Sequence, residues 1–183
     1  MPLPPASVNR QRVHVRSVQL CGYKREDGLW DVEAHLTDTK DQDYPLSSGL
    51  RPAGEPVHDM WVRVTIDREF NIQAAEAKTD GMPYIGLCDS IVPDYGKLVG
   101  LNLFHGFRRA VRELFGGVAG CSHLTELVMV LPTAAIQTFA SDMKDNEDHG
   151  AKPYQLDRCH ALESSSEAVR RYYPRWYRSQ KTG

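Results

Sequence analysis

Alternation of apolar and polar residues dominates the first 80 residues and predicts β-strands. The clearest run spans residues 30–36, where every second residue is apolar: Trp30, Val32, Ala34 and Leu36. A period of two residues is typical of a strand with one buried face. A weaker run begins at Arg12, slips near Ser17 and continues to Tyr23.

Two further strands follow in the same half of the chain. Apolar positions 62, 64 and 66 alternate with polar ones, and a fourth strand covers about residues 72–79. Turn residues separate the strands, including a Glu-Asp-Gly sequence at 26–28, and residues 40–56 form a long loop. The pattern over residues 11–80 therefore predicts a four-stranded antiparallel sheet with one apolar face, which other elements must cover.

The second half of the chain, residues 90–141, predicts helices. Residues 93–99 favour a short helix and residues 101–115 a longer one. The segment from about 121 to 140 has apolar residues on all sides in its middle, which indicates a buried helix. Pro132 is expected to kink it. The fold class expected is α+β, with these helices on one face of the sheet.

The ends of the chain complete the expected organisation. Residues 1–10 are expected to be loose, and residues 11–183 to form a single domain. The tail, residues 153–183, contains a cluster of aromatic residues: Tyr172, Tyr173, Trp176 and Tyr177. Because aromatic side chains gain most from burial, we expect the tail to pack back on the domain.

Composition narrows the function classes. The chain has 183 residues, 41% of them hydrophobic, and a formal net charge of -2. That length supports a real core, and the balanced charge gives no electrostatic argument for nucleic acid. Its apolar runs fall short of the roughly 20 residues that span a bilayer, and its start lacks a signal region. We expect a cytoplasmic protein that acts on a small molecule and not on membranes. The sequence does not indicate the oligomeric state.

The start of the buried helix carries the strongest chemical pattern. Cys121, His123 and Glu126 follow a glycine run, and His123 and Glu126 share a helix face. Thiolate, imidazole and carboxylate are ligands for zinc or iron. We predict one divalent metal ion bound by Cys121 and His123, with Glu126 as a ligand or an acid/base. The alternative is a capped helix start with a buried thiol.

Two other groups are candidates for the same site. His58 precedes the third strand and could act as a ligand or general base, with Asp59 orienting it; the alternative is a turn pair entering a strand. Cys88 and Cys159 complete the metal site if the tail packs beside the buried helix, and otherwise they are inert thiols. In a cytoplasmic chain of this size, widely spaced cysteines favour free thiols or ligands over disulfides.

The motifs Trp-Asp-Val-Glu at 30–33, His-Asp-Met-Trp at 58–61 and Gly-Cys-Ser-His-Leu-Thr-Glu-Leu at 120–127 resemble the bacterial family called domain of unknown function 2889. The resemblance extends over nearly the whole chain, including the Tyr-Pro-Arg-Trp tail at 173–176. It implies a single-domain bacterial protein and no particular activity. The family pattern includes these residues: His58, Asp59, Cys88, Cys121, His123, Glu126 and Cys159.

These observations support three hypotheses about function. The leading one is a small metal-dependent lyase or hydrolase that acts on a small carbonyl or aromatic compound. The second is a non-enzymatic protein that handles a metal or an iron–sulfur cluster through Cys88, Cys121 and Cys159. The third is a metal-free module that binds a small ligand among aromatic side chains.

Overall fold

A computed structural model describes residues 3–140, 142, 152–153 and 155–179 of the chain. It divides into two compact units, residues 1–141 and residues 142–183, which are described separately. The expectation that the tail packs back on a single domain stays a prediction. The loose start was expected over residues 1–10, and the described residues 3–13 have no helix or strand.

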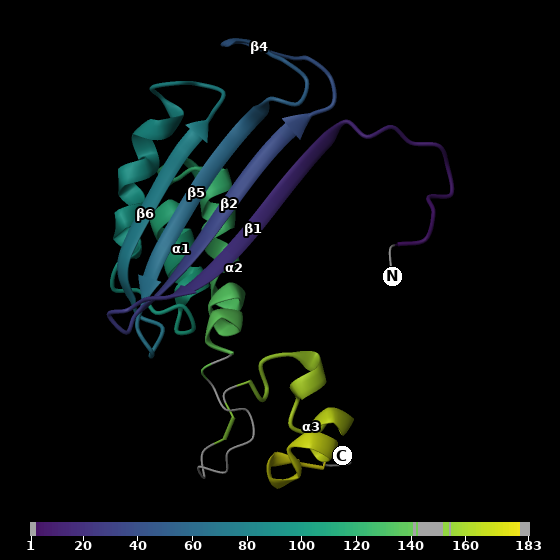
Figure 1. The fold of residues 1–183 in the computed structure, drawn as a ribbon, viewed down its shortest axis with the longest axis vertical. Helices are drawn as coiled ribbons and strands as arrows, with labels where there is room; N and C mark the ends of the chain where they lie inside the picture. Colours follow the sequence, from purple (N-terminus) through teal and green to yellow (C-terminus); the bar gives the residue numbers. More distant parts are fainter. Residues whose placement is uncertain (1–2, 141, 143–151, 154, 180–183) are drawn as a thin grey trace. The chain divides into compact units, whose positions relative to one another are not determined.

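The first unit is built on a four-stranded antiparallel sheet, as the alternation predicted. Its strands are β1 (His14–Lys24), β2 (Trp30–Lys40), β5 (Pro56–Ile66) and β6 (Ile72–Gly81). They lie in the order β1-β2-β5-β6, each beside its sequence neighbour in the meander (Figure 1). A separate short hairpin, β3 (Tyr44–Leu46) with β4 (Gly49–Arg51), lies within the predicted loop.

Helices from the second half of the chain cover one face of this sheet, which confirms the α+β class. They are the 3-10 helix η1 (Cys88–Leu98), α1 (Phe107–Phe115), the single turn η2 (Gly117–Ala119) and α2 (Ser122–Phe139). In Figure 1, α1 and α2 lie behind the strands. Helix α2 packs on β1, β2 and β5, and η1 packs on β6.

The pairing register places side chains in rows across the covered face. Val18, Leu36 and Met60 form one such row, and Leu20, Ala34 and Val62 form the next. The β2 residues in these rows are fully buried, as the alternation from Trp30 to Leu36 predicted. At one end of α2, Phe139 packs on Trp30, with 4.3 Å between their ring centroids.

Two expectations about the strands are wrong. The pairing of β1 with β2 is continuous from His14 to Lys24, so the expected slip near Ser17 is absent. Without a slip, Arg16 lies on the same face as Val18. Strand β5 begins at Pro56, so His58 and Asp59 lie inside a strand and point to opposite faces.

The expected helix over residues 101–115 is shorter than predicted. The side chain of Asn102 accepts hydrogen bonds from the backbone N–H groups of Phe104 and His105, at 2.9 and 3.1 Å. Gly106 then adopts a left-handed conformation, with φ of 70°, directly before α1. This side-chain turn competes with the helix and delays its start to Phe107.

The second unit contains α3 (Glu167–Tyr172) between the single turns η3 (His160–Leu162) and η4 (Pro174–Trp176). Ser166 caps α3 by accepting a hydrogen bond from the N–H of Val169. Asp157 accepts hydrogen bonds from the backbone and hydroxyl of Ser164, at 2.6 and 2.7 Å. In the part of the chain that the structure describes, no helix has the length and apolar character to cross a membrane.

Candidate metal centre

Asp38 is the carboxylate around which the candidate site is arranged. It continues the buried stripe of β2 two residues beyond Leu36 and is only 3% exposed. The strand pairing places Arg16 of β1 on one side of it and His58 of β5 on the other. The apolar rows of the covered face thus end in a polar row of three residues. A buried carboxylate requires partners, because burial without them is costly.

Hydrogen bonds from β1 satisfy Asp38. Arg16 donates to both carboxylate oxygens, from Nε and Nη2, at 2.8 Å each. His14 Nε2 donates to Oδ1 at 2.7 Å. Burial alone would raise the pKa of the Asp38 carboxyl, but the hydrogen bonds from Arg16, His14 and His58 hold that pKa well below its ordinary range. Asp38 is therefore ionised at neutral pH.

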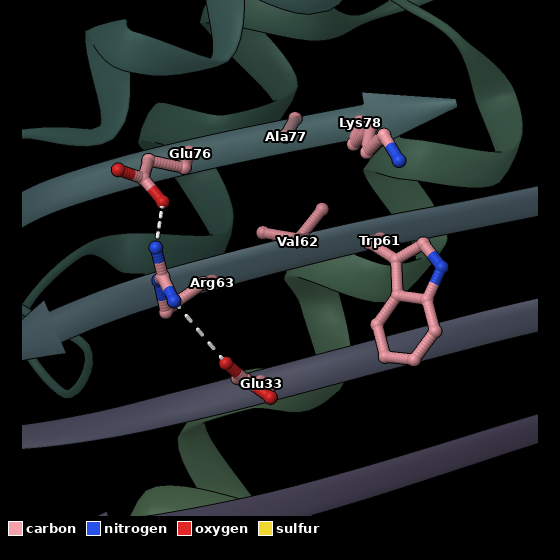
Figure 2. A pocket seen from close by; sticks show the side chains of 7 residues that line it. All are labelled: Glu33, Trp61, Val62, Arg63, Glu76, Ala77 and Lys78. Atoms are coloured by element: carbon pink, nitrogen blue, oxygen red, sulfur yellow. Dashed lines mark hydrogen bonds and ion pairs between the residues drawn. The ribbon is translucent and has the colours of Figure 1, made fainter. Parts of the chain in front are cut away.

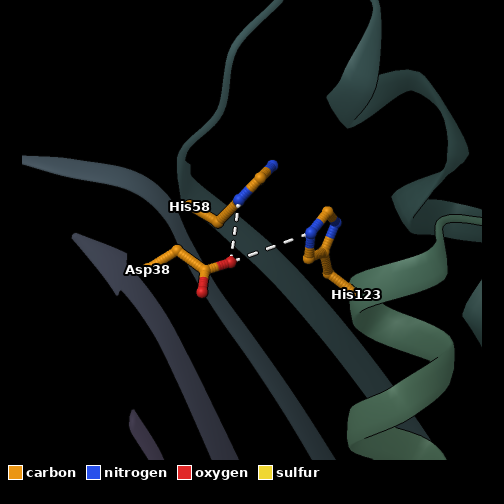
Figure 3. A group of neighbouring side chains, drawn as sticks. All are labelled: Asp38, His58 and His123. Carbon is orange, nitrogen blue, oxygen red and sulfur yellow. Dashed lines mark hydrogen bonds and ion pairs between the residues drawn. The ribbon is translucent and has the colours of Figure 1, made fainter. Parts of the chain in front are cut away.

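His58 and His123 approach the remaining side of Asp38. His58 Nδ1 donates to Asp38 Oδ2 at 3.0 Å, and His123 Nε2 lies 3.7 Å from the same oxygen. The two imidazoles stack with 3.7 Å between ring centroids. Figure 3 shows the three side chains turned toward one another from β2, β5 and the first turn of α2. One ligand atom from each lies within 4.8 Å of the others.

In both histidines a lowered pKa favours the neutral imidazole. Burial lowers the pKa of His58, and the neighbouring His123 lowers it further. Burial also lowers the pKa of His123, and the charge of Arg16 acts in the same direction. A neutral imidazole is the form that binds a metal ion or accepts a proton.

Tyr95 and the start of α2 place His123. Cys121 is the N-cap residue of α2, and its side chain makes no capping hydrogen bond. Its backbone N–H instead donates to the hydroxyl of Tyr95, at 3.1 Å. His123 follows two residues later, with its Nδ1 3.9 Å from the sulfur of Cys121 and 3.4 Å from Ser122 Oγ.

Glu126 lies one turn further along α2 and forms an ion pair with Arg16 Nη1. Its side chain is 62% exposed. Arg16 therefore bridges two carboxylates, Asp38 in the interior and Glu126 at the surface. The structure connects the predicted residue Glu126 to the His123 site through this arginine and not through direct contact with the histidine.

The predicted cysteine ligands lie at different distances from this centre. The group formed by Asp38, His58 and His123 contains no cysteine from the described residues. Cys121 neighbours the site through His123, while Cys88 begins η1 and is partly buried. Cys159 belongs to the second unit and is exposed.

Asp59 lies on the open face of the sheet, where it accepts a hydrogen bond from His35 Nε2 at 2.7 Å. His35 in turn stacks on Trp61, with 3.6 Å between ring centroids. The carboxylate that orients His58 is thus Asp38 and not its neighbour Asp59. The open face carries a histidine–carboxylate pair of its own, with an aromatic ring beside it.

A shallow hollow of about 550 Å³ lies on this open face, next to Trp61. Figure 2 shows Arg63 at its edge between Glu33 and Glu76, with Lys78 on the other side of the hollow. Arg63 forms ion pairs with both glutamates. These paired surface charges fit the solvated sheet face that the alternation predicts.

Sequence reasoning missed Asp38, Arg16 and His14. Asp38 extends the two-residue period of β2 by one step, so the pattern contained a signal: a carboxylate at a buried position. Arg16 shares the row of Asp38 only when β1 pairs without a slip. Predicting these residues of the site therefore required the correct register between β1 and β2.

A family model described as "Protein of unknown function (DUF2889)" matches residues 14–137. This confirms the resemblance to that family over residues 14–137, while the tail motif at 173–176 and Cys159 lie outside the matched range. The matched range includes the three residues of the candidate centre and the first-unit residues Asp59, Cys88, Cys121 and Glu126. Comparisons with curated proteins and with solved structures give no match.

Proposed function

The chain belongs to the DUF2889 family of proteins of unknown function, and we propose that it is a small metal-dependent enzyme. Asp38, His58 and His123 would hold the ion. The observation that carries this proposal is the convergence of three ligand-type side chains from three elements, within 4.8 Å of one another. Their number and type suit a catalytic ion, which keeps a coordination position open.

The spacing of the donor atoms supports a tetrahedral ion such as zinc. Ligand atoms about 2.1 Å from a tetrahedral ion lie about 3.4 Å from one another. Asp38 Oδ2 lies 3.0 Å from His58 Nδ1 and 3.7 Å from His123 Nε2, on either side of that value. Two histidines and a carboxylate also form the ligand set of many non-haem iron sites, so iron is the other candidate.

Charge in the cluster also favours a cation. Arg16 contributes one positive charge against the two carboxylates of Asp38 and Glu126, which leaves a formal excess of one negative charge. The histidines add no charge while they are neutral. If His58 Nδ1 is a ligand, the ion would be held by the tautomer with its proton on Nε2, in place of the tautomer that donates to Asp38.

The proposed reaction is a lyase or hydrolase step on a small carbonyl or aromatic compound. A bound ion supplies Lewis acidity or an activated water. Glu126 is exposed, ionisable and fixed by Arg16, and we assign it the proton transfer. His14 and Arg16 keep Asp38 oriented, as hydrogen-bonded partners of metal ligands commonly do.

The test is metal content and zinc affinity in full-length protein purified without chelators or a histidine tag. We expect about one zinc or iron ion per chain, and a fall in affinity of at least about 100-fold in His123→Gln, since loss of an outer partner alone costs 10- to 100-fold. The matched control is His35→Gln, which removes a histidine of the other His–Asp pair, on the open face.

Variants also separate this ligand set from the cysteine-based one. We expect Cys121→Ala to retain the ion and Asp38→Asn to lose it. If instead Cys121→Ala loses the ion and Asp38→Asn retains it, the thiols are the ligands. That result would favour a metal or iron–sulfur handling protein. Absence of metal from wild type, with no zinc binding on addition, would refute the metal proposal.

A metal-free acid–base site is the second candidate, favoured by one observation. Asp38 already accepts a hydrogen bond from His58 Nδ1, which leaves Nε2 of His58 as a potential proton acceptor. Catalytic turnover that persists in metal-free protein and is lost in His58→Gln would support this candidate over the metal-dependent one.

A further inference from the structure

A second hollow lies beside the candidate metal centre, between β1 and α2. Its volume is about 600 Å³, within the range of small-molecule pockets. Most of its lining is apolar, with residues from the sheet and from the helices α1 and α2: Val18, Leu36, Phe115, Leu127, Met129 and Val130. Val18 and Val130 are 46% and 38% exposed, so the apolar lining continues to the surface.

The hollow adjoins the polar row of the candidate centre. Val18 and Leu36 belong to the row directly after Arg16 and Asp38 on the same face of the sheet. Two residues along a strand span about 7 Å. Glu126 lines the hollow and pairs with Arg16, which itself pairs with Asp38. A ligand in the hollow can therefore extend one end toward the centre.

Charge limits which ligands fit. Among the described residues that line the hollow, Glu126 is the one with an ionisable side chain. Together with its partner Arg16 and with Asp38 it leaves one net negative charge, which disfavours an anion at the end nearest the centre, and its carboxylate can accept a hydrogen bond from a hydroxyl. Thr125 also lines the hollow, but its hydroxyl already bonds that of Tyr95, at 2.9 Å.

We propose that the hollow binds the apolar body of a neutral small molecule, aromatic or branched aliphatic, with its hydroxyl or carbonyl end at Glu126. This assignment deepens the proposed function, on which the role of that molecule as substrate rests. The binding itself requires only the apolar lining and Glu126, so it can be measured without the metal.

The experiment uses 2-naphthol and 2-naphthoate, two probes that share a ring system and differ in charge at pH 7. Their affinities for the full-length chain are measured by fluorescence titration, with a chelator and again with zinc. We expect 2-naphthol to bind in both conditions and 2-naphthoate to bind about fivefold more weakly, as expected for one partly exposed charge. Glu126→Gln should remove most of that difference.

Val130→Trp fills the hollow from its exposed edge and should weaken 2-naphthol binding at least about tenfold, because the bulky ring occupies the apolar volume. The matched control is Val99→Trp, at a valine that is 50% exposed and outside the lining. It should bind 2-naphthol as wild type does. Circular dichroism checks that both variants are folded.

Two results would overturn the proposal: unchanged 2-naphthol affinity in Val130→Trp, or equal affinity of wild type for the two probes. Light scattering adds a third, since a wild-type dimer that Val130→Trp dissociates would assign the hollow to a second copy of the chain. His123→Gln separates the two proposals, because it should lose zinc and keep 2-naphthol. Zinc binding without 2-naphthol binding would refute the hollow alone.

Discussion

The hydroxyl of Tyr95 fixes the first turn of α2 and with it His123. Tyr95 is fully buried in η1 and stacks on Phe115, with 4.4 Å between ring centroids. Its Oη accepts the N–H of Cys121 at 3.1 Å and donates to the carbonyl of the same residue at 3.0 Å. The hydroxyl of Thr125, at 2.9 Å, is its third partner. Burial raises the pKa of Tyr95, so the hydroxyl keeps its proton.

Tyr95→Phe should therefore destabilise the protein without creating a cavity. The ring and its stack on Phe115 remain, and three hydrogen bonds disappear. A typical hydrogen bond contributes about 1 kcal/mol, and a buried group left without a partner costs about 1–3 kcal/mol. The Thr125 hydroxyl can turn to another acceptor, so we expect a loss of about 2–3 kcal/mol.

The assay is urea unfolding followed by circular dichroism, in chelator so that metal does not contribute. Tyr84→Phe is the control, since Tyr84 is 45% exposed. A zinc titration of the same proteins should show weaker binding only in Tyr95→Phe, because the first turn of α2 then holds His123 less firmly. We expect zinc affinity to fall about tenfold, as it does when other residues that orient a metal ligand are replaced.

Equal unfolding midpoints for Tyr95→Phe, Tyr84→Phe and wild type would refute the reasoning. A double-mutant cycle with Thr125→Val locates the effect. If Tyr95 acts through these hydrogen bonds, the two changes should be non-additive by at least about 0.5 kcal/mol. Additive losses would assign the effect to general loosening of the core.

Two further predictions concern the frame of the first unit. A Cβ at Gly22 would lie 1.9 Å from Thr138 Oγ1 of α2. Gly22→Ala should therefore lower the free energy of unfolding in urea by about 1–3 kcal/mol. Adding Thr138→Gly to this variant should recover part of that loss. Burial would raise the pKa of Asp67, but hydrogen bonds from Asn71 and the N–H of Glu69 lower it. Asp67 therefore stabilises the fold above the pKa of an unfolded aspartate, and the stabilisation is lost as pH falls through the lower folded value. In urea unfolding, the free energy that Asp67→Asn loses relative to wild type should be largest at neutral pH and shrink below about pH 4.

The sheet was predictable because its information is local. Each strand of the four-stranded sheet pairs with the strand of that sheet that follows it in the chain, and a two-residue period from Trp30 to Leu36 identifies the buried face. Helix α2 was predictable for a similar reason, since its apolar middle spans several turns. The start of α1 was not, because one side chain, that of Asn102, changes the local hydrogen bonds.

The candidate centre was predictable only in part. His123 and His58 are chemically conspicuous, and both belong to it. The two-residue period of β2 signals that Asp38 is buried, but only the pairing of three strands shows that it lies between Arg16 and His58. The slip wrongly predicted near Ser17 concealed that Arg16 lies beside Asp38, because a shift of one residue moves a side chain to the other face of a sheet.

Arg16 is the main structural partner of Asp38 in the polar row. A buried carboxylate is satisfied by one guanidinium that binds it through two hydrogen bonds, and Arg16 supplies that to Asp38. The histidines lie on the other side of Asp38, where His58 adds a further hydrogen bond to the carboxylate, and burial lowers the pKa of both. A neutral imidazole has one nitrogen lone pair: in His58 this is on Nε2 while Nδ1 donates to Asp38, so a cation at Nδ1 would require the proton to be on Nε2 instead. Glu126 adds a second negative charge through the same arginine. The arrangement therefore favours a positive ligand, which is why metal content decides between the functions proposed for this chain.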